Sequence, residues 1–116
     1  MQEYMLIYQG GDPDWHENTS PEEMQASMAQ WEEWMTALSE QGKLVSGGNP
    51  LHYAGKRVTP EGVVTDIAAS EFKELVSGYS IVAAKSTDEA VELAKSCPIM
   101  HYPGIIVEVR EVLSMD

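Results

Sequence analysis

The sequence predicts an α+β protein built on an antiparallel sheet, and three observations lead to this fold class. Two segments begin with helix-capping signatures and continue with apolar residues at helical spacing. Short runs rich in β-branched and aromatic residues precede and follow each of these segments. The chain of 116 residues is 43% hydrophobic and 22% charged, which is an ordinary composition for one folded domain. We therefore expect a single domain over residues 1–116.

The first predicted strand is Glu3–Tyr8, and it is apolar on both faces. Because side chains alternate along a strand, the two faces carry different residues: Met5 and Ile7 on one, and Tyr4, Leu6 and Tyr8 on the other.

The first predicted helix covers residues 21–41. Ser20 fits the N-cap position, Pro21 the first turn and Glu23 the reciprocal position of a capping box. An apolar stripe follows at helical spacing: Met24, Met28, Trp31, Met35 and Leu38. We expect this stripe to pack in the core, and Trp34, which lies beside the stripe, to mark an interface.

The middle of the chain predicts a bent strand and a hairpin. Leu44–Leu51 contains two adjacent glycines, so this strand is expected to bend or bulge before it ends. Lys56–Thr59 and Val63–Thr65 flank a Pro-Glu-Gly turn, which is typical of a β-hairpin.

The last third of the chain predicts a central strand, a second helix and a closing strand. Tyr79–Ala84 is apolar on both sides, which indicates a central position in the sheet. A second capping box begins at Ser86, and the helix that follows carries Cys97 on its buried side and stops at Pro98. Ile105–Val112 then closes the sheet.

These elements follow the order β, α, β with a hairpin, β, α, β, which is a ferredoxin-like split βαβ pattern with an inserted hairpin. Right-handed crossovers place both helices on one face of the antiparallel sheet. The strands at 3–8 and 79–84 are nonetheless apolar on both faces, and leaving such a patch in water costs about 25 cal/mol per Å². We therefore expect a second copy to cover the helix-free face, in an isologous homodimer that forms a dimeric α/β barrel.

The charge balance and the cysteine count restrict the partners and the compartment. Acidic residues outnumber basic ones 19 to 7, and residues 1–42 contain no Lys or Arg. This acidity disfavours nucleic acid and anionic membranes, and no apolar run approaches the roughly 18 residues of a membrane span. A solvated helix face explains the acidic half most simply, and attraction of a cation or a basic partner is the alternative. A single cysteine without an export signal indicates a cytoplasmic protein.

Two histidines lie where an imidazole could meet a ligand. His101 belongs to the loop 98–104, which leads into the last strand, and His52 follows the bent strand. Histidine exchanges protons near neutral pH, so each is a candidate catalytic acid or base, and an exposed loop histidine is the alternative for both. Tyr8 is a candidate ligand-binding residue, because it could line an aromatic pocket with two tryptophans of the first helix.

No cofactor or metal is predicted. Asp12, Asp14 and His16 alternate and, with Glu23, approach the spacing of a calcium loop, but Glu17 stands where that loop requires glycine. Imidazole and carboxylate also suit Zn or Mn, so a transition-metal site is one hypothesis and a solvated acidic loop is the other. The sequence has no nucleophile elbow, phosphate loop or dinucleotide fingerprint.

Several segments in a fixed order carry a family resemblance along nearly the whole chain: YMLIY, SPEEM, GGNPL, GYSIV, STDEAVELAKSCP and VEVREV. Together they resemble the YCII-related family, whose second branch is often called the DGPF family. The resemblance implies a ferredoxin-like subunit assembled as a dimeric α/β barrel. The function of this family is mostly uncharacterised. Some members occur beside sigma-factor regulators, and one branch resembles small lyases that act on chlorinated aromatic rings.

The resemblance singles out Asp66 and also shows two departures. The Asp-Gly-Pro-Phe signature falls at residues 66–69, where the aspartate is kept but the glycine and proline are not. Asp66 is therefore a candidate catalytic residue, with Glu71 and Lys73 nearby to bind a ligand, and a turn aspartate is the alternative. The YCII branch also carries a histidine at the start of the first helix and an aspartate after the second, a pair that this chain lacks.

The hypothesis from the sequence is a homodimer with a small-molecule cleft formed by the first strand, residues 44–66 and the 98–104 loop. Asp66 with His52 or His101 would supply lyase-like acid–base chemistry there. The alternative is a non-catalytic binding or dimerisation module linked to regulation or stress response.

Overall fold

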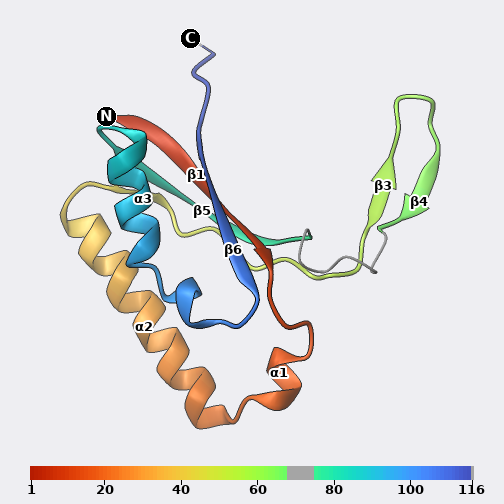
Figure 1. Ribbon diagram of the computed structural model, residues 1–116, viewed down its shortest axis with the longest axis horizontal. Helices are drawn as coiled ribbons and strands as arrows, with labels where there is room; N and C mark the ends of the chain where they lie inside the picture. The colour runs from red at the N-terminus through yellow and green to blue at the C-terminus, as the bar shows by residue number, and fades with distance from the viewer. Residues whose placement is uncertain (68–74, 116) are drawn as a thin grey trace.

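The computed structural model describes residues 1–67 and 75–115, which form a main sheet, a separate hairpin and four helical segments (Figure 1). The strands are β1 (Gln2–Gly10), β2 (Leu44–Ser46), β3 (Lys56–Val58), β4 (Val64–Asp66), β5 (Val76–Ala84) and β6 (Ile105–Glu111). The helices are α1 (Trp15–Asn18), α2 (Pro21–Glu40), α3 (Thr87–Lys95) and the 3₁₀ helix η2 (Pro98–His101).

The main sheet contains four strands in the order β2, β5, β1, β6, and every neighbouring pair is antiparallel. When the β3–β4 hairpin is set aside, the crossing connections through α2 and α3 interleave the two βαβ halves, as they do in ferredoxin-like proteins. The predicted α+β fold with an inserted hairpin is therefore confirmed.

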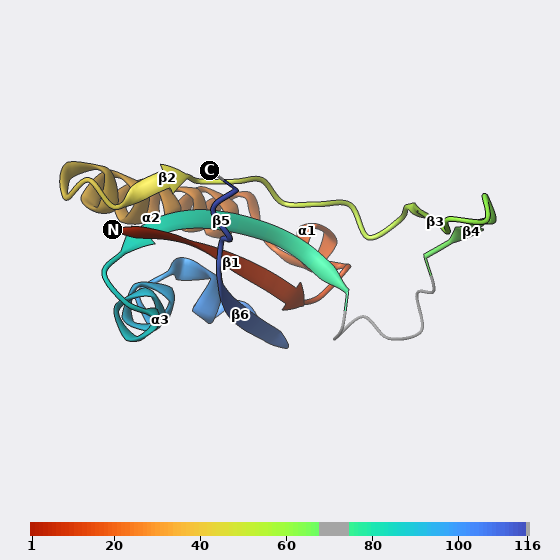
Figure 2. The same ribbon diagram turned by 90° about the horizontal axis from the view of Figure 1, so that it is seen from above.

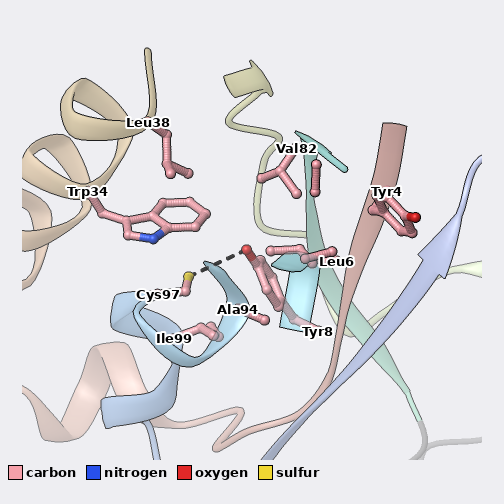
Figure 3. Close-up of a cluster of buried hydrophobic side chains, with 11 residues drawn as sticks. Tyr4, Leu6, Tyr8, Trp34, Leu38, Val82, Ala94, Cys97 and Ile99 are labelled. Carbon is pink, nitrogen blue, oxygen red and sulfur yellow. Dashed lines mark hydrogen bonds between the residues drawn. The ribbon is translucent and has the colours of Figure 1, made fainter. Parts of the chain in front are cut away.

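The core lies between the main sheet and the pair α2 and α3 (Figure 3). Along β1, Tyr4, Leu6 and Tyr8 are buried, whereas Met5 and Ile7 on the opposite face are only half-buried. The central strand β5 alternates in the same way. The period of two predicted for both strands is confirmed, and the more deeply buried face is the one that meets the helices.

The inner face of α2 differs from the predicted stripe. The helix begins as expected, with the Ser20 hydroxyl accepting a hydrogen bond from the Glu23 N–H at 3.2 Å. The core position expected for Met28 is wrong, because this side chain is 70% exposed. Trp34, expected to mark an interface, is instead buried within the chain, and its indole N–H donates to Ser96 Oγ at 3.1 Å. That hydrogen bond satisfies the polar edge of the buried ring.

The second helix and the segment after it agree with the predictions. The Ser86 hydroxyl accepts a hydrogen bond from the Glu89 N–H at 3.1 Å and caps α3. Ala90 and Ala94 face the core, and small residues allow this short helix to lie close to the sheet. Cys97 is 1% exposed, so its predicted place in the core is confirmed.

The bend predicted in the 44–51 segment occurs directly after β2. Gly48 has a φ of +69°, and a Cβ atom built there would lie 1.7 Å from the carbonyl oxygen of Tyr79 in β5. Only glycine permits both this backbone conformation and this close approach. The chain then returns to the sheet edge, where Pro50 forms a bridge with Gly78.

The β3–β4 hairpin, residues 56–66, is called the arm from here on. It forms a two-stranded sheet of its own and projects beyond the main sheet, as Figures 1 and 2 show. The described chain has a radius of gyration of 15.6 Å, whereas a compact chain of this length has about 13 Å. The hairpin was predicted, but its separation from the body was not.

The helix-free face of the sheet is called the open face from here on. Its larger apolar side chains include Met5, Ile7, Tyr79, Ile81 and Ile106, which come from β1, β5 and β6. The first four are half-buried by their neighbours in the sheet, and Ile106 is 57% exposed. In the part of the chain that the structure describes, both long helices pack on the other face, so no helix covers these side chains.

Candidate functional site

A pocket of about 250 Å³ lies between α1, the N-terminal half of α2 and the segment that contains η2. Glu23 and Gln30 line it from α2, and Trp15 from α1. His101, at the end of η2, and the adjacent Tyr102 form the remaining wall. The pocket therefore combines a carboxylate, an imidazole and two aromatic rings, which are the groups that bind and polarise a small molecule.

Hydrogen bonds to a single hydroxyl fix the aromatic wall. The Tyr102 hydroxyl lies 2.6 Å from the Ser27 hydroxyl and accepts a hydrogen bond from the Trp31 indole N–H at 3.2 Å. Trp15 stacks on the Tyr102 ring, with centroids 5.1 Å apart and planes 17° apart. The ring of His16 in turn meets Trp15 edge-on at 5.2 Å. α1 is thus held against the body through stacked rings.

Behind the pocket, a polar chain crosses the core. The Tyr8 hydroxyl donates to Ser80 Oγ at 2.7 Å, and Ser80 Oγ donates to the carbonyl of Gly47 at 2.8 Å. Cys97 Sγ lies 3.5 Å from the same tyrosine hydroxyl. Burial raises the pKa of Tyr8 and the pKa of Cys97, so both groups keep their protons at neutral pH. This chain of polar groups therefore holds β1, β5 and the β2 bend together.

The structure does not bring all the predicted site residues together. His101 lines the pocket, whereas Asp66 ends β4 in the arm and forms an ion pair with Lys56. His52 is exposed in the loop between β2 and the arm. Tyr8 is 4% exposed in the core and lies edge-on to Trp31 at 5.9 Å. Glu71 and Lys73 lie outside the described residues.

The pocket also differs from the predicted cleft in the elements that form it. Of the three segments expected to form the cleft, only the 98–104 segment supplies lining residues. Trp15, Ser27 and Tyr102 were not predicted as site residues. Trp15 and Tyr102 are far apart in the sequence, and α1 has only four residues, too few to show a helical period. A tryptophan among polar residues was the one signal that could have identified this wall.

The acidic loop before α1 forms a local turn. Asp12 Oδ1 accepts a hydrogen bond from the backbone N–H of Asp14 at 2.9 Å, which is an Asx turn. Within residues 1–67 and 75–115, no group of three or more His, Cys, Asp or Glu is placed to hold a metal ion. Over the same residues, no helix has the length and hydrophobicity needed to cross a bilayer.

The fold and the pocket define a small ferredoxin-like α+β protein with an aromatic pocket beside its first long helix. The model of the YCII-related domain matches residues 3–116, so the chain belongs to the YCII-related family. The family predicted from the order of sequence segments is therefore confirmed, and the assignment to the DGPF branch stays a prediction. A search of curated proteins found no match.

Proposed function

We propose that this protein binds a small molecule in the pocket between α1, α2 and η2, and that it does so as a homodimer. The observation that carries the proposal is the convergence of Trp15, Tyr102, Glu23 and His101 on one pocket. The ring wall favours a flat ligand that can stack. Among the residues that the structure describes, Glu23 is the carboxylate that lines the pocket and no Lys or Arg lines it, which favours an uncharged or cationic ligand.

The chemistry that this pocket supports best is proton transfer to or from the bound molecule. His101 presents an imidazole to the ligand and Glu23 a carboxylate, which are the two side-chain types that most often act as general acid and base. Asp66 and His52 lie outside this pocket in one chain, so their proposed roles depend on the assembled homodimer. A non-catalytic binding module is the second candidate function, and the exposure of His101 favours it, since catalysis by an imidazole benefits from the exclusion of water.

The test of the pocket is a fragment screen by NMR with aromatic amines and neutral aromatic compounds. Binding is expected to shift the signals of the Trp15 indole and the His101 imidazole. Trp15→Ala should weaken binding at least tenfold, because it removes the stacking wall. Glu33→Gln, on the outer face of α2, is the matched control and should leave binding unchanged. Unchanged binding in Trp15→Ala, or binding confined to another surface, would refute the pocket.

A second variant separates catalysis from binding. His101→Asn keeps a polar group of similar size but cannot transfer a proton. If the protein is an enzyme, this variant should bind the same fragment and lose turnover of any substrate built on it. Retained turnover in His101→Asn would refute the catalytic role of His101, whereas binding without turnover by the wild-type protein would make the non-catalytic interpretation the better one.

The homodimer is supported by the open face. Met5 and Ile81 are cross-strand partners there, and they are joined by the neighbouring pair Ile7 and Tyr79. When a second copy packs with its open face against this one, the open face of each copy is removed from water. This burial stabilises the dimer by about 25 cal/mol per Å² of apolar surface. Sedimentation at micromolar concentration should give the dimer mass, and Ile7→Asp should give a folded monomer. A monomeric wild-type protein would end the dimer hypothesis.

A further inference from the structure

We propose that the arm, residues 56–66, is an intersubunit arm, which packs on the second copy and not on the body of its own chain. The inference rests on the homodimer proposed above and extends it, because it assigns a role to a part of the chain that lies outside the open face.

The first observation is the exposure of apolar side chains in the arm. Val58 and Val64 are directly opposite each other in the β3–β4 register and are 66% and 59% exposed. Val63 is 53% exposed. An isolated two-stranded hairpin is only marginally stable in water, and this one has three residues in each strand. A surface that covers the valine pair would stabilise it.

The second observation is the direction in which the arm projects. In Figure 1, α2 and α3 lie on one side of β1 and β5, and the arm rises on the other side. The open face is on that same side, as is the C-terminal segment, where Leu113 is 78% exposed. A body that rests on the open face therefore lies next to the arm.

These two observations favour a second copy as the occupant. One two-fold axis pairs the two open faces and, in the same operation, places each arm beside the other body. The arm also suits an acidic partner. It carries Lys56 and Arg57 against Glu61 and Asp66, so its formal net charge is zero, whereas the whole chain carries −12. The arm can thus approach an acidic copy without the repulsion that the rest of the surface would produce.

The experiment places a spin label at the tip of the arm through Glu61→Cys and detects it from the second copy. Cys97 is 1% exposed, so the native thiol should not take the label, and wild-type protein treated in the same way is the control. The labelled protein is mixed with an isotopically labelled copy that carries no spin label. We expect broadened signals from Ile7, Ile81 or Ile106 of the isotopically labelled copy, and unchanged signals from Ala37 on the outer face of α2.

The outcomes separate the arm from the dimer. A dimer in which no intermolecular broadening occurs overturns the intersubunit arm and leaves the homodimer standing. A monomer overturns both.

A pair of variants gives an independent result. Val64→Asp places a charge in the valine pair, and Thr65→Asp places the same charge on the opposite face of the same strand. Val64→Asp should weaken the dimer at least tenfold more than Thr65→Asp, with the circular dichroism of both variants unchanged. Equal dissociation constants for the two variants would overturn the role of the valine pair.

Discussion

The polar chain in the core allows a sharp test of how β1, β5 and the β2 bend are held together. Tyr8→Phe removes one hydroxyl and leaves the bond from Ser80 Oγ to the Gly47 carbonyl intact. Ser80→Ala removes the central hydroxyl, so the Gly47 carbonyl loses its donor and the tyrosine hydroxyl keeps only its contact with Cys97 Sγ. The second change therefore disturbs more buried groups than the first, although both remove the same hydrogen bond.

The magnitudes follow from the number of groups left without a partner. Tyr8→Phe should lower the free energy of unfolding by about 1 to 1.5 kcal/mol, the net value of one buried hydrogen bond. Ser80→Ala should lower it by about 2 to 3 kcal/mol, because it removes two hydrogen bonds, one from the buried Tyr8 hydroxyl and one to the half-buried Gly47 carbonyl. The bond between the two side chains is lost only once in the double variant. The free energy of unfolding of the double variant should therefore fall by about 1 kcal/mol less than the sum of the decreases in the two single variants.

The assay is urea unfolding followed by circular dichroism. All variants are measured at one high protein concentration, because the association free energy of a dimer would contribute to the measured stability and would change with concentration. Ser39→Ala, on the exposed side of α2, is the control for the serine substitution and should change the free energy by about 0.5 kcal/mol or less. If the decrease in the double variant equals the sum of the decreases for Tyr8→Phe and Ser80→Ala to within about 0.5 kcal/mol, the coupling of the two hydroxyls is refuted.

Three further predictions follow from the fold. Gly48→Ala should prevent folding, because the added Cβ would meet a backbone carbonyl of β5. Gly42 has a similar φ of +68° but open space around it, so Gly42→Ala should lower the free energy of unfolding in urea by only about 1 kcal/mol. Stability should fall above about pH 10 by up to about 1.4 kcal/mol per unit, because Tyr8 ionises in the unfolded chain at its ordinary pKa of 10.0 and stays protonated when folded. Unfolding curves against pH should show a smaller loss in Tyr8→Phe, and an equal loss would contradict this origin. A thiol reagent should leave Cys97 unmodified in the native protein and react after unfolding, and rapid native labelling would contradict its burial.

Much of the fold was predictable because local signals and burial agree. Ser20 and Ser86 each cap a helix through the hydrogen bond that the sequence indicates. The alternation of Tyr4, Leu6 and Tyr8 against Met5 and Ile7 identified which side chains share a face, although not which face meets the helices. That choice depends on connections between distant elements, which a local pattern does not contain.

The inner face of α2 shows the limit of a periodic pattern. Met28 belongs to the predicted stripe and Trp34 lies beside it, so a rotation of the helix about its axis exchanges their burial. In the observed orientation, the Trp34 indole N–H donates a hydrogen bond to the hydroxyl of Ser96, after α3. A partner of this kind, 62 residues away along the chain, is invisible to a pattern read within one helix.

The candidate site was predictable only in part, for a similar reason. His101 was placed in a ligand-facing loop, and it does line the pocket. Asp66 was expected near it, but Figure 1 shows that the hairpin which carries it projects away from the body. The direction in which a connecting segment leads leaves no trace in composition or spacing.

The burial of Trp34 beside Trp31 has an optical consequence. The two indole rings lie 5.8 Å apart and nearly perpendicular, at 89°. Two identical chromophores at this separation couple their electronic transitions. A rigid chiral arrangement of such a pair gives a strong circular dichroism signal in the ultraviolet. The chain thus contains a built-in spectroscopic probe of its native packing, which needs no dye and disappears when the rings lose their fixed angle.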